Sequence, residues 1–395
     1  MRYLSVLASN IFINVPTVVL VLMYSHFGTY QDSARLGTAL AYIAPLYLLF
    51  TMQHGVAILA GRKGWSESTA LRLKLAPFYL LIAVIASIVC REYLILMIGV
   101  FRLGDLLYEP YFSEKIRSMD HRGLFVSSGS RLFVFVATVA AVYWFRLPLM
   151  EAVTLLAVTN IAMTAVSCGS GWISQVRVVT ATRTDFWLGV GACIASLSVN
   201  VPRYFLGRAA AADLAAYSNM LTIVMAATLM FVSFNNLYFA RCARSAELGV
   251  HRFLVRLLGF GVLVAAMFWV FIVNDYDVAR LLTGLALGQR YLPYAGLVFL
   301  FWLFYWGLYL QNVANCVLIY LGAGKVIMLS NLLMLALLAG GCFMVTGNMS
   351  ALSAAVVVNV SMAVFLGVAL SLTFLKLQGA IEELAGVNKM KDQPA

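Results

Sequence analysis

Two Asn-Val-Pro tripeptides, each inside a long apolar stretch, divide this chain of 395 residues into two similar halves. The first is Asn14-Val15-Pro16, and the second, Asn200-Val201-Pro202, begins 186 positions later. In each half, a helix that carries a proline and a polar amide is followed by a short loop, a second apolar span and a basic loop. Repeated membrane halves with interrupted helices are typical of transporters.

Composition restricts the chain to one broad class. Hydrophobic residues make up 63% and charged residues 11%, whereas soluble domains are closer to half apolar and a quarter charged. The chain is therefore predicted to be an integral membrane protein. Its formal charge of +11 is attributed to basic cytoplasmic loops rather than to nucleic-acid binding, because Lys and Arg determine membrane orientation.

Apolar stretches predict an all-α membrane fold of twelve transmembrane helices. The predicted spans are 4–25, 37–60, 76–92, 93–112, 125–146, 149–172, 185–207, 214–240, 253–273, 291–316, 324–346 and 350–375. They form two six-helix lobes, 1–180 and 181–376, related by a pseudo-two-fold axis along the membrane normal. Residues 377–395 are predicted to be a short, loose cytoplasmic tail.

Most of the 27 Lys and Arg residues fall in the loops on one side of these spans. This asymmetry predicts that both termini are cytoplasmic. The N-terminal apolar run has no small-residue cleavage site and is interpreted as a retained span. The six cysteines form no CxxC or Cys/His cluster, so neither disulfides nor a metal site are predicted. No Walker A or common catalytic motif is present, which excludes direct ATP hydrolysis and predicts a transporter without a cofactor rather than an enzyme.

Charged side chains inside a membrane span are costly, so they are candidates for function. Arg102, Asp105 and Glu109 in the fourth span lie near one helix face. They could form an inward-facing stripe that binds a polar substrate or carries a coupling proton. Alternatively, Arg102 and Asp105 could neutralise each other, with Glu109 near the cytoplasmic interface.

Two arginines follow the second tripeptide. Arg203 comes directly after its proline, and Arg208 follows about one turn later. Guanidinium groups suit phosphate, so the pair could form a cationic lip for a diphosphate at the outer end of a central cavity. They could equally be interfacial arginines whose heads extend to water.

His54 and several amides are weaker candidates. His54 could couple transport to protons, although a hydrogen-bonded histidine in a helix bundle is more common. The amides within spans could bind sugar hydroxyls or could hold helices together. They are Asn10, Asn14, Asn160, Asn200, Asn235, Asn236, Gln311, Asn312, Asn315 and Asn359.

The tenth span is aromatic along one face, with Trp302, Tyr305 and Tyr309 followed by Asn312. This face could stack on sugars in a cavity. Core packing or an interfacial aromatic belt is the alternative that we favour.

Three segments resemble the bacterial polysaccharide-repeat-unit flippases of the Wzx type. The first is 200–206 (Asn-Val-Pro-Arg-Tyr-Phe-Leu) with 213–218 (Asp-Leu-Ala-Ala-Tyr-Ser). The others are 104–112 (Gly-Asp-Leu-Leu-Tyr-Glu-Pro-Tyr-Phe) and 279–284 (Ala-Arg-Leu-Leu-Thr-Gly). The chain is shorter than is usual for this family, and 213–218 lacks the common glycine before the tyrosine.

The resemblance implies membership of a superfamily that also holds multidrug/toxin exporters and peptidoglycan-precursor flippases. It implies two six-helix lobes around a cavity that opens alternately to each side. The substrate would be an undecaprenyl-diphosphate-linked oligosaccharide of O-antigen, capsule or exopolysaccharide, moved across the inner membrane to the periplasmic leaflet. Proton or sodium coupling, and partnership with a polysaccharide polymerase and a chain-length regulator, are further implications.

Two other functions remain open. A multidrug or organic-cation exporter of the same superfamily should present acidic groups in its cavity. A membrane-embedded polysaccharide polymerase or ligase would need a long periplasmic loop, and the longest candidate is only 274–290. The charge of the cavity separates the first alternative from the flippase, because a diphosphate-linked substrate requires a basic cavity.

Overall fold

The structure, a computed structural model, describes residues 16–59, 61, 63–168, 182–242, 252, 254–262 and 276–391. Throughout these ranges every regular element is helical, and eight helices are long and apolar enough to cross a membrane. The prediction of an all-α membrane protein is therefore confirmed. The first tripeptide is only partly covered, since Asn14 lies outside the described residues.

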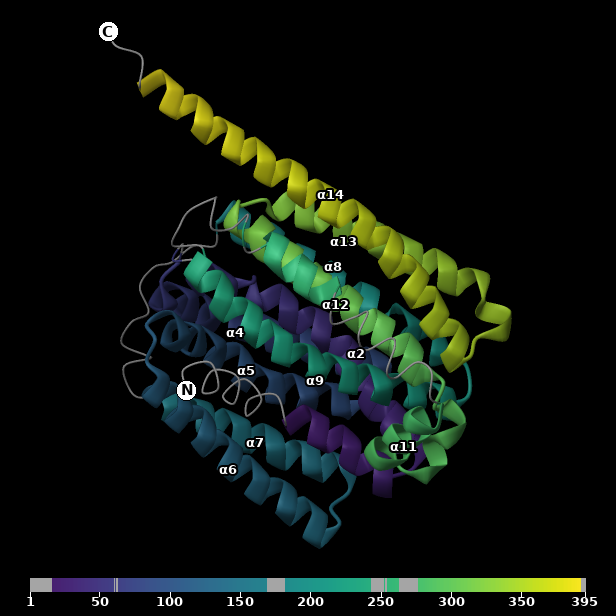
Figure 1. Ribbon diagram of the computed structural model, residues 1–395. Helices are drawn as coiled ribbons and strands as arrows, with labels where there is room; N and C mark the ends of the chain where they lie inside the picture. The colour runs from purple at the N-terminus through teal and green to yellow at the C-terminus, as the bar shows by residue number, and fades with distance from the viewer. Residues whose placement is uncertain are drawn as a thin grey trace.

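The helices run roughly side by side along the bundle (Figure 1). Those of the N-terminal half are Pro16–Phe27, α2 (Tyr30–Thr51), α3 (His54–Leu59), α4 (Trp65–Cys90), α5 (Tyr93–Arg117), α6 (His121–Phe145) and α7 (Leu149–Cys168). Those of the C-terminal half are α8 (Arg183–Leu206), α9 (Ala211–Cys242), α11 (Tyr276–Leu287), η3 (Gln289–Tyr294), α12 (Leu297–Tyr320), α13 (Gly324–Met344), η4 (Thr346–Asn348) and α14 (Ala351–Lys391).

Several predicted spans differ from the observed helices. The helix matched to the span predicted at 76–92 begins earlier, at Trp65, and most of the span predicted at 253–273 lies outside the described residues. The span predicted at 37–60 is divided between α2 and α3, because Met52 and Gln53 have left-handed backbone angles, with φ of 50° and 54°. The span predicted from 291 begins as the 3-10 helix η3, which contains Pro293, and only then becomes α12. The apolar part of α14 ends at Gly379, close to the predicted end at 375. The loose tail predicted from 377 is wrong over most of its length, since α14 continues as a helix to Lys391 and projects beyond the bundle (Figure 1).

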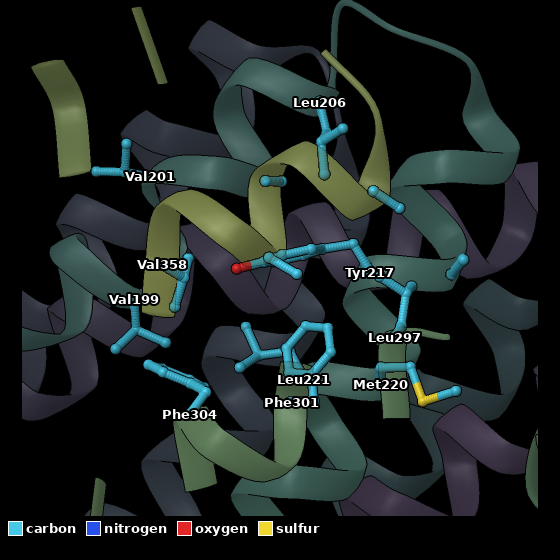
Figure 2. Close-up of a cluster of buried hydrophobic side chains, with 14 of the residues drawn as sticks. Val199, Val201, Leu206, Tyr217, Met220, Leu221, Leu297, Phe301, Phe304 and Val358 are labelled. Atoms are coloured by element: carbon cyan, nitrogen blue, oxygen red, sulfur yellow. The ribbon is translucent and has the colours of Figure 1, made fainter. Parts of the chain in front are cut away.

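Each half packs around its own apolar core. One cluster consists of residues between Leu20 and Ala157. A second joins α8, α9, α12, α13 and α14, and Figure 2 shows Tyr217 of α9 between Leu206 and Phe301 in it. The ring of Tyr217 lies edge-on to that of Phe301, with centroids 5.1 Å apart, a favourable aromatic arrangement. The second cluster also contains Ala34 of α2, so α2 packs into the apolar core of the C-terminal half as well as into that of its own.

Glycines bring the two halves into close contact along α2. A Cβ atom on Gly37 of α2 would lie 2.5 Å from Oγ of Ser218 in α9. A Cβ atom on Gly189 of α8 would lie 2.6 Å from the carbonyl oxygen of Leu49 in α2. Tyr204 of α8 adds a hydrogen bond to the carbonyl of Ala41 at 2.7 Å. The backbone of α2 therefore lies directly against α8, and any added methyl group would separate them.

We expect Gly189→Ala to lower the thermal unfolding midpoint in detergent, because the new methyl group has no space beside a backbone oxygen. Overpacking of this kind costs about 1–3 kcal/mol. Gly340→Ala is the matched control, since this helical glycine has no other group within 4 Å of the new Cβ atom. A midpoint for Gly189→Ala equal to that of the control would contradict the close contact.

Candidate functional site

A cavity of about 410 Å³ lies between the two halves. The N-terminal half contributes the helix Pro16–Phe27, α2, Gln53 and α5, and the C-terminal half contributes α8, α9, α12 and α13. Its volume is within the range of small-molecule sites. A cavity enclosed by both halves is where a substrate could be reached alternately from either side.

The cavity is basic and rich in amides. Arg102 and Arg203 are the charged residues of its lining, and no carboxylate is present among the described residues that line it. Its polar lining residues are Thr17, Tyr47, Gln53, Ser196, Asn200, Thr222, Thr228, Gln311, Asn312, Asn315 and Asn331. Such a surface offers hydrogen bonds to hydroxyl groups and positive charge to an anion.

Arg203 is the most unusual group in this lining. Its side chain is only 6% exposed, and it donates to Asn200 Oδ1 at 2.8 Å and to the Ser218 carbonyl at 3.0 Å. Its Nε atom is buried without a hydrogen-bond partner, and within the described residues no carboxylate forms an ion pair with it. A buried charge without a counter-charge is costly, so this position favours an anionic ligand.

Arg102, the second cation of the lining, pairs with a carboxylate that also contacts an arginine of another helix. It forms the predicted ion pair with Asp105 at 3.0 Å. Asp105 also lies 3.5 Å from Arg131 of α6 and accepts a hydrogen bond from Asn160 of α7 at 3.0 Å. Two guanidinium groups therefore flank one carboxylate, which leaves a net positive charge in this group. Asp105 itself is not among the residues that line the cavity.

Arg72 and Arg131, two of the basic residues counted toward the cytoplasmic side, are buried inside helices rather than exposed in loops. Arg72 of α4 is fully buried and lies 3.1 Å from Glu109, which is not among the residues that line the cavity. Arg131 is 6% exposed and donates to Thr164 at 2.7 Å. Both arginines can lie inside helices because each donates hydrogen bonds to acceptors on neighbouring helices.

The amides of the cavity form a network in the C-terminal half. Asn331 donates to the carbonyl of Gly191 at 2.9 Å and accepts from Gln311 at 3.2 Å. Asn312 accepts from Asn235 at 3.2 Å, so Asn235 supports the lining from behind. These contacts fix the orientation of the amide groups that face the cavity.

The remaining candidates from the sequence lie elsewhere. Arg208 is exposed on the turn after α8 and does not line the cavity with Arg203. Tyr305 is buried in an aromatic cluster with Phe231 and Trp306 and does not line the cavity, whereas Asn312 of the same predicted face does. Asn14 is outside the described residues. Conversely, Asn331 and Thr222 line the cavity although the sequence did not single them out.

His54 belongs to a polar contact between the halves rather than to the cavity. Its Nδ1 atom is 2.8 Å from Ser68 Oγ, and its Nε2 atom is 3.1 Å from Asp185 Oδ1. Lys63 donates to the other oxygen of Asp185 at 2.7 Å. Asp185 also completes the capping box of α8 with Thr182. The first turn of α8 is therefore tied to the α3–α4 region of the other half.

A second contact joins the halves at the opposite end of α2. Arg290 of η3 donates to the carbonyls of Gly28 and Tyr24. Tyr30 donates to the carbonyl of Arg290 at 2.8 Å, and its ring lies 5.0 Å from the guanidinium carbon. The two halves therefore meet through polar contacts at both ends of α2, with the cavity between them.

No protein-family profile matches the chain, and no curated protein matches it. Solved structures do. A eukaryotic MATE transporter, AtDTX14, aligns over 97% of this chain and 98% of its own, with a TM-score of 0.65 and 14% identity. A multidrug resistance MATE family transporter of the MOP superfamily, in an outward-facing conformation, aligns over 96% of both chains with a TM-score of 0.65 and 10% identity.

This chain has the fold of the MOP-superfamily transporters. A further similar structure is a MOP-superfamily transporter from Pyrococcus furiosus, with a TM-score of 0.56, 10% identity and 95% coverage of both chains. That protein is described as having a binding pocket of reversed polarity that suggests a different function. Within this fold the polarity of the cavity is therefore a variable feature, and it must be read from the residues of each chain.

We expect Lys63→Met and Asp185→Asn each to destabilise the protein, and the double variant to cost less than their sum. The two side chains are 10% and 9% exposed, and coupling between contacting charges is about 0.5–3 kcal/mol. Thermal unfolding of the four proteins in detergent measures this coupling. Strict additivity would show that the pair contributes nothing to the contact between the halves.

Proposed function

We propose that this protein is a flippase for an undecaprenyl-diphosphate-linked oligosaccharide, moving the repeat unit from the cytoplasmic to the periplasmic leaflet by alternating access. The single observation that carries this proposal is Arg203, a buried cation without a carboxylate in the lining of the central cavity. A diphosphate supplies the missing negative charge. Arginine binds phosphate with parallel hydrogen bonds and keeps its charge at any physiological pH.

The rest of the lining suits the sugar part of such a substrate. Asn312, Asn315 and Asn331 offer both donors and acceptors to hydroxyl groups. A sugar crossing bare hydrocarbon would leave those groups unsatisfied, at several kcal/mol each. The polyprenyl tail has no such need and can remain in the bilayer beside the seam between the halves.

The proposal extends to topology and partners. Residues 1–180 and 181–376 act as two lobes in the inner membrane, with both termini and the tail 377–395 in the cytoplasm. An ion gradient drives the cycle, since a cation moving down 100 mV supplies about 2.3 kcal/mol. A polysaccharide polymerase would consume the flipped unit, with a chain-length regulator acting after it.

An exporter of drugs or organic cations is the second candidate, because the similar solved structures include MATE multidrug transporters. The charge of the cavity lining argues against this function. A cationic drug needs a carboxylate or an electron-rich aromatic surface, whereas the charged lining consists of Arg102 and Arg203. Asp105 is engaged by Arg102 and Arg131, and Glu109 by Arg72.

We expect Arg203→Gln to reduce transport of the lipid-linked unit about 10–100-fold, because a hydrogen bond to a charged group contributes about 1.5–3 kcal/mol. The assay is restoration of surface polysaccharide in a strain that lacks the gene. Arg280→Gln removes one exposed arginine of the same half and serves as the control. Normal polysaccharide in the deletion strain, with no second flippase present, would refute the proposal.

The exporter alternative makes the opposite prediction. Expression in a drug-sensitive host should leave its resistance to organic cations unchanged, because the cavity repels them. Increased resistance that Arg203→Gln preserves or improves would favour the exporter over the flippase.

A further inference from the structure

A second, larger cavity opens at the end of the C-terminal half. It has a volume of about 900 Å³ and lies between the start of α8, the α12–α13 turn and the last membrane-spanning turns of α14. The residues that line it are Arg183, Trp187, Leu321, Gly322, Ala323, Gly324, Lys325, Val326, Leu372, Leu375, Lys376 and Gly379. We call it the basic groove. It shares no lining residue with the central cavity.

Three cations from three different helices converge on the basic groove. They are Arg183 of α8, Lys325 of α13 and Lys376 of α14. Among the described residues that line the groove there is no carboxylate, and none of these three cations has an ion pair within the described part of the chain. Segments 142 and 51 positions apart have therefore placed three positive charges in the lining of one groove, where they favour an anion.

Two further donors are present in the same wall. The α13 helix begins at Gly324, and no side chain caps its N-terminus. The first N–H groups of a helix carry a partial positive charge and bind anions well. In addition, Trp187 lines the groove and its buried indole N–H has no hydrogen-bond partner. The groove therefore combines three charges with the uncapped N-terminus of α13, and Trp187 contributes to its wall.

The surroundings of the groove identify the kind of anion. The apolar span of α14 extends from Ala351 to Gly379, so Lys376 and Gly379 mark its end. Just before them, Leu375 is 66% exposed and Phe374 is 38% exposed. Cations at the end of a span, above exposed apolar side chains, match a lipid whose headgroup is anionic and whose chains lie along the helix. Basic pockets between membrane helices bind headgroups in this way.

We propose that the basic groove binds an anionic phospholipid of the surrounding leaflet, with its phosphate between Arg183, Lys325 and Lys376. This proposal is independent of the transported substrate, because no residue of the central cavity takes part. The lipid would connect α8, α13 and α14 at their common end. Binding therefore holds three helices of the C-terminal half together through one ligand.

The test uses the full-length protein in detergent, titrated separately with phosphatidylglycerol and phosphatidylcholine while bound lipid is counted by native mass spectrometry. We expect phosphatidylglycerol to bind more tightly. Lys325→Gln with Lys376→Gln should weaken it by on the order of tenfold or more, and Trp187→Phe by a smaller factor. Arg91→Gln with Arg146→Gln, which removes two exposed charges from other turns, is the matched control.

Each outcome decides the proposal. Equal affinity for both lipids, or equal loss in the control and the Lys325/Lys376 variant, would overturn it. So would inorganic phosphate binding with the same affinity as phosphatidylglycerol, since a free anion would then be the ligand. If the double variant does not fold, the single variants Lys325→Gln and Lys376→Gln replace it, and each should weaken phosphatidylglycerol binding severalfold.

Discussion

The cost of a charge in hydrocarbon is the constraint on which the rest of this structure depends. Cations within the helices of the N-terminal half are paired with carboxylates of α5: Arg72 of α4 meets Glu109, and Arg131 of α6 shares Asp105 with Arg102 of α5 itself. Arg203 in the C-terminal half breaks this pattern. Its neighbours are carbonyl, amide and hydroxyl oxygens, which stabilise a guanidinium without neutralising it. Among the described residues, no carboxylate neutralises this charge.

The fold alone does not determine what enters that cavity. Structures with TM-scores of 0.65 include multidrug transporters, and at identities of 10–14% the shared property is the arrangement of helices. The side chains that face inward are free to change while the packing is kept. Close contacts such as Gly37 with Ser218 and Gly189 with Leu49 fix the seam, whereas Arg203 and the amides around it determine the chemistry. Two proteins with one fold can in this way take substrates of opposite charge.

The sequence predicted the membrane-protein class and most helices, because hydropathy is a local signal. It also named Arg203 as a candidate, because a charge inside an apolar span can be seen from the sequence alone. It could not predict which partner each charge meets. Arg72 and Arg131 lie inside α4 and α6, and their burial is accompanied by ion pairs with Glu109 and Asp105 of α5. His54 was seen as a titratable group, but its contact with Asp185 spans 131 positions. The break at Met52 and Gln53 was also missed, since no glycine or proline marks it.

Helix α8 takes part in the basic groove, in the contact between the halves and in the central cavity, because its successive turns face different parts of the protein. In its first two turns, Arg183 and Trp187 face the basic groove, whereas Asp185 binds Lys63 and His54 of the other half. Gly189 then meets α2, and Asn200 and Arg203 line the central cavity. A phospholipid bound at Arg183 therefore acts on the same turn that holds the halves together. If the halves must separate at this end for substrate to enter, the Lys63–Asp185 ion pair must break while the lipid stays bound to the same turn of α8. The lipid composition of the leaflet would then affect transport.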